Sequence, residues 1–369
     1  MKFVAFSLFS VLAACGSSSN PPAPAPSPTA APAPAAAAPA PAPGVAARSA
    51  DTATRSEVGE VNPRLLRRFK PLRPVFASAD EPAPSEAQVD LGRMLFFDKR
   101  LSRDRDLSCN SCHALDHYGV DNESTSSGAK GARGHRNSPS VYNAAGQVAC
   151  FWDGRAGNVE EQAKGPILNP GEMAMPDAKA VVAVLQGIPG YVAAFRTAFP
   201  GDASPVSYDN LGRAIGAFER KLVTPSRWDR YLAGDHAALT APEVAGLKLF
   251  TDIGCMTCHT GELVGGSMFQ TVGVVEAWPN QADQGRYDVT KVASDHMMFK
   301  VPSLRNVAKT APYFHDGSAR TLDEAVTMMA RHQLGEELSK SDVAAIVTWL
   351  GSLTGELPAK YIAPPHLPE

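Results

Sequence analysis

The residues with the clearest chemical meaning form two Cys-x-x-Cys-His motifs. They are Cys109, Cys112 and His113 in the first motif, and Cys255, Cys258 and His259 in the second. In such a motif each thiol adds to a vinyl group of haem, and the adjacent histidine ligates the iron. A single copy could also be a zinc half-site or a redox dithiol. Two copies in one chain predict two covalently attached c-type haems, with His113 and His259 as iron ligands.

The start of the chain has the composition of an export signal. Lys2 precedes an apolar run over residues 3–12, and small residues lead to Cys15. We expect residues 1–15 to be a lipoprotein signal peptide whose lipobox cysteine, Cys15, carries lipid. Export suits c-type haem, which is attached outside the cytoplasm. The expected location is therefore the periplasm, with a lipid anchor in the outer membrane. Ordinary cleavage, which gives a soluble periplasmic product, is the alternative.

A low-complexity segment follows the signal. Between residues 21 and 47 only Ser27, Thr29, Gly44 and Val45 are neither proline nor alanine. Such a composition favours extended polyproline-like conformations and cannot build a core. We expect residues 16–75 to be a disordered Pro/Ala-rich tether, so that the fold begins near residue 76.

The overall composition fits a globular body behind this tether. Hydrophobic residues make up 44% of the chain, and the net charge is −3. A core can therefore form. No basic run supports binding to nucleic acid. Cys150 remains a single cysteine without an assigned partner, and burial as a small apolar residue is the simplest interpretation of it.

The remaining pattern predicts helices and an internal repeat. Apolar residues recur with helical spacing over 208–223 and 340–352, and Thr240 with Glu243 forms a capping box. The motif Phe-Trp-Asp-Gly at 151–154 returns as Phe-His-Asp-Gly at 314–317, each followed at the same offset by an acidic segment. We expect a mainly α fold with long loops, made of two cytochrome c-like domains that each hold one haem.

The motifs resemble those of the bacterial dihaem cytochrome c peroxidase family, which includes the MauG-type methylamine-utilisation enzymes. The resemblance runs from about residue 85 to 352. The stretches that carry it include 95–98, 136–140, 151–155, 161–166, 172–173, 299–306, 310–317 and 333–335. It implies an N-terminal peroxidatic haem domain over 76–230 and a C-terminal electron-transfer haem domain over 231–369.

The family reduces hydrogen peroxide at the first haem, which His113 ligates here. Glu172 matches the family's acid/base carboxylate, which moves a proton from the bound oxygen to the leaving one. Gln162 matches a second polar group of that pocket. From the residues alone, a solvated loop acid is the preferred interpretation of Glu172, and the resemblance is what favours the catalytic role.

Electrons enter this family at the second haem, here on His259. Its sixth ligand is a methionine that matches Met329, with Met328 as a neighbouring competitor, and His/Met ligation raises the potential. Trp152 matches a tryptophan that couples the two haems. MauG-type members carry a tyrosine at the second haem, so a methionine favours the peroxidase branch.

The resemblance also implies a calcium ion and several partners. Asn137, Thr310 and Pro312 match a site that holds one Ca²⁺ between the domains through an amide oxygen, backbone carbonyls and water. The implied partners are hydrogen peroxide, a small cytochrome c or cupredoxin as electron donor, and a second copy of the chain, since family members often dimerise.

One position departs from the pattern. Many family peroxidases carry a histidine about sixteen residues after the proximal histidine, which caps the resting first haem. Here that position is Ala129. We therefore expect the first haem to be five-coordinate or water-ligated at rest. MauG-type enzymes also lack that histidine, so two alternatives to the peroxidase stay open: a MauG-type oxidase that modifies a partner protein, and a dihaem electron carrier without catalysis.

Overall fold

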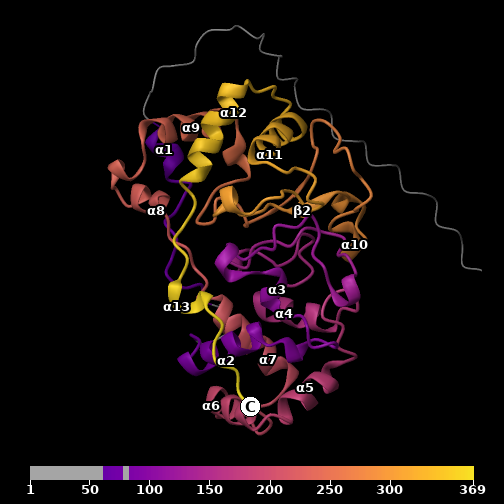
Figure 1. Ribbon diagram of the computed structural model, residues 1–369. Helices are drawn as coiled ribbons and strands as arrows, with labels where there is room; N and C mark the ends of the chain where they lie inside the picture. The colour runs from indigo at the N-terminus through magenta and orange to yellow at the C-terminus, as the bar shows by residue number, and fades with distance from the viewer. Residues whose placement is uncertain (1–60, 78–82) are drawn as a thin grey trace, which may run out of the picture. The chain divides into compact units, whose positions relative to one another are not determined.

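The computed structural model describes residues 61–77 and 83–369, which are mainly helical (Figure 1). The described residues contain one two-stranded antiparallel sheet, formed by β1 (Phe269–Thr271) and β2 (Met298–Lys300). The prediction of a mainly α fold with long loops is confirmed. The signal peptide, Cys15 and the tether up to residue 60 lie outside the described residues.

The helices fall into two sequential sets. The first set is α1 (Pro63–Leu66), α2 (Glu86–Phe97), α3 (Cys109–Cys112), α4 (Val159–Leu168), α5 (Ala178–Gln186), α6 (Pro189–Ala198) and α7 (Tyr208–Glu219). The second set is α8 (Arg227–Leu232), α9 (Ala241–Asp252), α10 (Tyr287–Thr290), α11 (Leu322–Met329), α12 (Lys340–Gly351) and α13 (Ala359–Ile362). The two helices predicted from periodicity are α7 and α12, and the predicted capping box at Thr240 opens α9.

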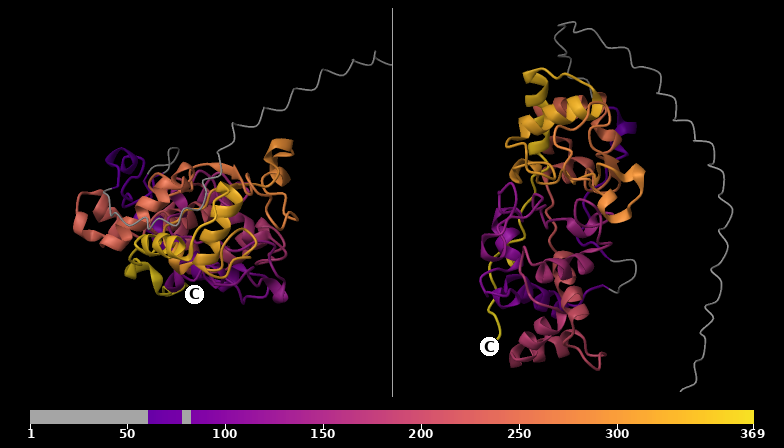
Figure 2. Two further views of the ribbon diagram at one scale, coloured as in Figure 1. Left: turned by 90° about the horizontal axis from the view of Figure 1, so that it is seen from above. Right: turned by 90° about the vertical axis from the view of Figure 1, so that its right-hand side faces the viewer.

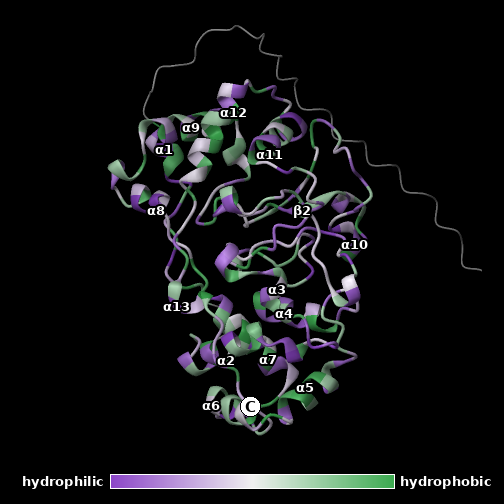
Figure 3. Cartoon of the chain, viewed as in Figure 1, coloured by the Kyte–Doolittle hydropathy of each residue, from purple (hydrophilic) through white to green (hydrophobic). Residues whose placement is uncertain are grey.

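Two large hydrophobic clusters and two small ones fill the interior of the described residues. The first large cluster joins α2, α4, α5, α6 and α7, and the second joins α8, α9 and α12. Fully buried aromatic side chains lie at the centre of each, with Phe96 and Phe218 in the first and Trp228 and Trp349 in the second. Figure 3 shows the hydrophobic residues along α5, α9 and α12. The apolar helix faces therefore pack inward in two separate places.

Each large cluster is built on a close helix crossing at a glycine. A Cβ at Gly92 of α2 would lie 1.8 Å from the carbonyl oxygen of Ala214 in α7. A Cβ at Gly246 of α9 would lie 2.0 Å from the carbonyl oxygen of Ala345 in α12. Only glycine lets the backbones approach this closely. In both halves this crossing involves the helix that leads into a haem motif.

The packed structure begins earlier in the chain than expected. Val61, Phe69 and Phe76 are all buried, and the Phe69 ring meets Trp228 edge-on at 5.3 Å. The expectation that the tether extends to residue 75 is therefore wrong for residues 61–75. Prolines at positions 63, 71 and 74 interrupt this segment, so its sequence resembles the Pro-rich tether before it, and only the surface that receives these side chains reveals their role.

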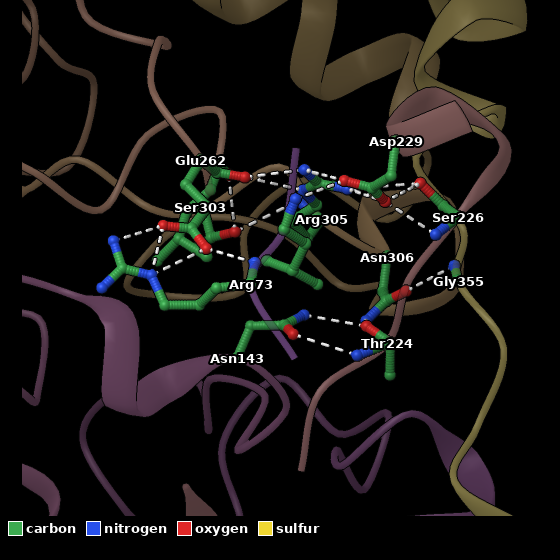
Figure 4. Close-up of polar contacts among 12 residues, drawn as sticks. Arg73, Asn143, Thr224, Ser226, Asp229, Glu262, Ser303, Arg305, Asn306 and Gly355 are labelled. Carbon is green, nitrogen blue, oxygen red and sulfur yellow. Dashed lines mark hydrogen bonds and ion pairs between the residues drawn. The ribbon is translucent and has the colours of Figure 1, made fainter. Parts of the chain in front are cut away.

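Polar side chains join the two halves (Figure 4). Thr224 Oγ1 accepts hydrogen bonds from the side-chain amides of Asn143, at 2.8 Å, and Asn306, at 2.9 Å. Close by, Arg305 donates to both carboxylate oxygens of Asp229 at 2.6 and 2.8 Å. These buried groups satisfy one another, as buried polar groups must.

The C-terminal segment returns to the first helical set (Figures 1 and 2). Its last residue, Glu369, accepts a hydrogen bond from Gly190 of α6, and Tyr361 of α13 packs against Phe218. Among the described residues, no single helix has the length and apolarity needed to cross a bilayer; only the bent pair α5 and α6, taken together, meets that criterion by length and composition.

Candidate functional site

The first haem motif occupies α3 and the residue that caps it. Cys109 and Cys112 are both free thiols, and His113 follows directly. The Nδ1 atom of His113 lies 3.3 Å from the carbonyl oxygen of Gly119, so Nε2 remains for a metal. Burial lowers the pKa of His113, and the imidazole is then neutral, as iron ligation requires.

The second haem motif repeats this arrangement. Cys255 and Cys258 are free, and Nδ1 of His259 lies 3.3 Å from the carbonyl oxygen of Val264. Burial lowers the pKa of His259 to about 4. Each motif therefore offers two thiols and one oriented neutral imidazole, which is the donor set of a c-type haem.

A cavity of about 810 Å³ opens beside the first motif. Residues that sequence analysis assigned to the first site line it together, namely Cys109, Cys112, His113, Trp152, Gln162 and Glu172. Its volume is within the range of cavities that enclose large organic ligands. The residues at the first motif therefore fit a covalently held haem, and the carboxyl and amide groups share its cavity.

The structure ties Glu172 to the end of α4. The Glu172 amide donates to the carbonyl of Asn169 at 3.0 Å, and the next amide, of Met173, donates to the carbonyl of Pro166 at 3.1 Å. Burial raises the pKa of the Glu172 carboxyl, while the charge of Arg155 and a hydrogen bond from Asn169 oppose that shift. Glu172 is thus a half-buried cavity acid rather than a solvated loop acid.

A second loop closes over the backbone of Glu172. Ala129 is 6% exposed, and its amide donates to the Glu172 carbonyl at 2.8 Å. A Cβ at Gly128 would lie 1.8 Å from the carbonyl oxygen of Gly171. The loop that carries the unusual Ala129 is therefore packed directly on the segment that carries the candidate acid.

Trp152 lies where the two halves of the chain meet. Its indole N–H donates to the carbonyl of Asn137 at 2.9 Å, and its own carbonyl accepts from the Lys300 amide at 2.8 Å. The ring of His315 lies 6.4 Å from that of Trp152 and stacks on Phe299 at 4.2 Å. An oxidisable indole is thus held by backbone contacts from both halves.

The three residues expected to bind calcium are linked through the segment that contains Asn122 and Glu123. The Asn137 side chain donates to the carbonyl of Glu123 at 2.9 Å, and the adjacent Asn122 side chain donates to the carbonyl of Ala311, between Thr310 and Pro312, at 2.8 Å. Across residues 61–77 and 83–369, no group of three or more His, Cys, Asp or Glu side chains could hold a metal ion. Any calcium here would have to use amide and backbone oxygens.

Met328 and Met329 end α11, and a π-helical turn, Ala330–Leu334, follows directly. Both methionines are half-buried. Neither belongs to a hydrophobic cluster of the described residues, in contrast to Val326 one turn earlier. Their side chains are therefore not part of an apolar core, and both remain candidate iron ligands.

The internal repeat extends to the backbone conformation. Phe151 and Phe314, 163 positions apart, both have positive φ, at 64° and 71°. An antiparallel bridge joins Cys150 to Ala156, and its counterpart at the same offset joins Tyr313 to Ala319. The helices that follow, α4 and α11, begin at matching positions. In this register, Pro166 of α4 corresponds to Met329 of α11.

Two buried charged groups in the first cavity were missed by sequence reasoning. Glu219 is 4% exposed, and burial raises its pKa to about 8; Lys300 is 5% exposed, and burial lowers its pKa to about 8. Lys300 donates to the side-chain oxygen of Gln147. Glu219 lies four residues after Ile215 and therefore on the apolar face of α7. That position is the sequence signal from which its burial could have been predicted.

Comparison with known proteins agrees with this geometry. The profile of the di-haem cytochrome c peroxidase family matches residues 86–237. The cytochrome c551 peroxidase of Pseudomonas aeruginosa is 47% identical over 296 residues, which cover 79% of this chain and 85% of the relative. That of Nitrosomonas europaea is 45% identical, with coverage of 78% and 85%.

More distant relatives show the breadth of the group. The methylamine utilization protein MauG of Methylophilus methylotrophus is 32% identical, with coverage of 76% of this chain and 86% of the relative. The crystal structure of a MauG-like protein associated with microbial copper homeostasis superposes with a TM-score of 0.68 at 30% identity, and covers 80% of this chain and 95% of that chain. Given these matches and the two haem motifs, the chain belongs to the di-haem cytochrome c peroxidase family.

Proposed function

We propose that this protein reduces hydrogen peroxide to two molecules of water at the haem held by Cys109, Cys112 and His113. The observation that carries this is the shared cavity, in which Glu172 and Gln162 face the same space as the haem attachment residues. The balanced reaction consumes one peroxide, two protons and two electrons. The haem iron supplies the redox centre at which the oxygen–oxygen bond is broken.

Glu172 moves the proton in this proposal. Its carboxylate takes a proton from the peroxide oxygen nearer the iron and gives it to the departing oxygen, which then leaves as water rather than hydroxide. The burial of the carboxyl raises its pKa above the ordinary value of a glutamate, which favours the proton uptake that this role requires. The Gln162 amide, from the same cavity wall, orients the peroxide by hydrogen bonding.

Electrons reach the second haem, on His259, from a small cytochrome c or cupredoxin, and Trp152 relays them to the first. Met329 completes the coordination of the second haem, with Met328 as the competitor. The absence of both methionines from the hydrophobic clusters of the described residues supports a ligand role. The sulfur-to-iron charge-transfer band of the oxidised protein tests it. Replacement of the true ligand by alanine should remove that band, and replacement of the other methionine should leave it.

The first haem is open at rest in this proposal, because Ala129 cannot ligate iron and its amide is held by the Glu172 carbonyl. A high-spin component in the spectrum of the oxidised protein is the expected result. A spectrum with only low-spin haem contradicts it.

We also propose one calcium ion bound by Asn137, Thr310 and Pro312. Among the described residues, the carbonyl oxygens of Thr310 and Pro312 accept no hydrogen bond, so they are free to act as ligands. Equilibrium dialysis of the holoenzyme against ⁴⁵Ca²⁺ should give one ion per chain, and Asn137→Ala should lose it.

The proposal places the protein in the periplasm. Two domains, 76–230 and 231–369, each carry one haem, and Cys15 carries lipid that anchors the chain to the outer membrane. The two large hydrophobic clusters support a division into two parts, with the whole of α8, which spans residue 230, in the second. Mass spectrometry of the mature N-terminus tests the anchor, and sedimentation tests whether the protein is a homodimer.

The competing function is that of a MauG-type oxidase, which one observation favours, namely Ala129 at the usual histidine position. A non-catalytic electron carrier is the third alternative. Mixing the protein with reduced cytochrome c and peroxide separates them. Fast turnover supports the peroxidase, slow turnover with a persistent oxidised state supports the MauG type, and no reaction supports the carrier.

A further inference from the structure

A second, smaller cavity lies on the far side of Glu172. It measures about 290 Å³. It shares five lining residues with the haem cavity, namely Phe151, Arg155, Pro166, Asn169 and Glu172. None of the first motif's Cys109, Cys112 and His113 lines it. We call this cavity the vestibule; it adjoins the haem cavity without including the residues that attach the haem.

Gly165 forms part of the vestibule wall and is unusual for its position. It lies inside α4 and is exposed. Glycine is a poor helix former, so an exposed helical glycine needs a reason. Close packing is not the reason, because a Cβ there would meet only the tip of the Phe151 ring, at an ordinary contact distance of 3.6 Å. A side chain at Gly165 would instead occupy space in the vestibule.

The internal repeat indicates what this space replaces. In the register that aligns Phe151 with Phe314, Gly165 and Pro166 of α4 correspond to Met328 and Met329 of α11. The second half carries two long side chains on this helical turn. At the matching positions the first half carries a glycine and a proline, and neither has a polar side chain. The vestibule therefore occupies the place where the other half carries its methionines.

The remaining walls are fixed and polar. The guanidinium of Arg155 stacks over the Phe151 ring, with 3.4 Å between its central carbon and the ring centroid, and pairs with Asp153 at 2.9 Å. Asn169 and Glu172 add an amide and a carboxyl. Such a lining suits a small, uncharged, hydrogen-bonding molecule. A volume of about 290 Å³ holds several molecules of the size of water.

We propose that the vestibule is the access route by which hydrogen peroxide reaches Glu172 and the open face of the first haem, and that Gly165 keeps it open. This rests on the proposed function of the first haem as the peroxide site. Product water leaves by the same route. Arg155 acts as a positioning residue, since it holds the Phe151 side of the wall.

The test compares three substitutions in one helix position. Gly165→Trp fills the vestibule, Gly165→Leu fills it in part, and Gly165→Ala is the control that restores a good helix former without reaching across the space. The probe is cyanide, which enters as neutral HCN. Its association with the ferric first haem is followed by stopped-flow absorbance in the holoenzyme after ascorbate reduction of the second haem, so that resting ligation does not affect the comparison.

We expect Gly165→Trp to slow cyanide association by about tenfold or more, which corresponds to a barrier increase of ~1.4 kcal/mol. Gly165→Leu should be intermediate, and Gly165→Ala should bind at the wild-type rate with a raised Tm. Unchanged haem spectra show that the variants fold. If Gly165→Trp and Gly165→Leu both bind cyanide at the wild-type rate, the vestibule proposal is overturned, even if peroxide turnover is normal. Slowed association in a protein without peroxidase turnover supports the vestibule and overturns the proposed function instead.

Discussion

Glu172 is the residue on which the proposed chemistry depends most. Its type and its place in a family-like stretch are readable in the sequence, but its burial is not, because burial comes from the Ala129 loop that packs on its backbone. The same is true of Glu219 and Lys300, whose charges suggest surface positions. Residue types that carry chemistry can be predicted from motifs, whereas the environment that tunes them depends on contacts between distant segments.

Replacement of the candidate acid should separate catalysis from structure. We expect Glu172→Gln to lower kcat for peroxide reduction by roughly 10²–10⁴-fold, since the amide cannot carry the proton. Haem content and absorption spectra should stay those of the wild type. Glu86→Gln, which changes an exposed helix residue in the same half, is the matched control and should keep full activity. Equal turnover by the two variants would rule out Glu172 as the acid/base group.

Glu219 gives a prediction for stability against pH. Burial raises its pKa in the folded protein to about 8, so the folded state holds a proton that the unfolded state has lost above pH ~4.5. The wild type therefore loses stability as pH rises towards 8, at up to ~1.4 kcal/mol per pH unit from this group.

Glu219→Gln removes that dependence. Denaturant titrations of both proteins from pH 5 upwards should show that the free energy of unfolding of the variant rises relative to that of the wild type as pH rises. Above pH 8 the difference between the two should become nearly constant. A difference in the free energy of unfolding that stays constant from pH 5 to 8 would mean that Glu219 is already ionised in the folded protein.

At the scale of elements, the repeat organises the molecule. The predicted helices α7 and α12 appear because their apolar periodicity is strong, and their glycine-mediated partners α2 and α9 lead into the haem motifs. The segment 61–76 was not predicted to be folded, because its prolines at 63, 71 and 74 continue the composition of the tether, and its buried residues Phe69 and Phe76 are recognised only from the contacts they make. The vestibule could not be predicted either, because the role of Gly165 depends on its position beside Phe151 in the folded chain.

The contact between the loops around Gly128 and Glu172 can be tested on its own. An alanine at Gly128 would place a methyl group 1.8 Å from the Gly171 carbonyl oxygen, so one loop must move. We expect Gly128→Ala to reduce peroxide turnover about tenfold or more through displacement of Glu172, with intact haem attachment. Gly134→Ala in the same loop meets nothing closer than 3.7 Å and should be silent. Wild-type kinetics for Gly128→Ala would show that the loop contact does not position the acid.

At the scale of the whole molecule, buried polar contacts hold together segments that are far apart in the sequence. Arg305 is nearly inaccessible and pairs with Asp229, whose pKa the neighbouring guanidinium lowers against the effect of burial. We expect Asp229→Asn to destabilise the protein by ~3–5 kcal/mol, because it leaves a buried charge unpaired. Asp209→Asn, at an exposed ion pair, should change stability little.

The pH dependence of that difference follows from the lowered pKa. The contribution of Asp229 is present above the unfolded-state pKa of ~3.8 and is lost as pH falls through the folded-state value. Denaturation curves should therefore show that the difference in the free energy of unfolding between the wild type and Asp229→Asn decreases in acid. A gap that persists unchanged at the lowest pH would mean that the ion pair is not its source.

The most direct measurement of the central claim is the stoichiometric oxidation of a reduced small cytochrome c by hydrogen peroxide in the presence of the holoenzyme. A peroxidase of this kind oxidises two cytochromes for each peroxide consumed, in many turnovers, and Glu172→Gln slows that oxidation without changing the stoichiometry. Absence of peroxide-dependent oxidation, or equal rates for the wild type and Glu172→Gln, would contradict the account.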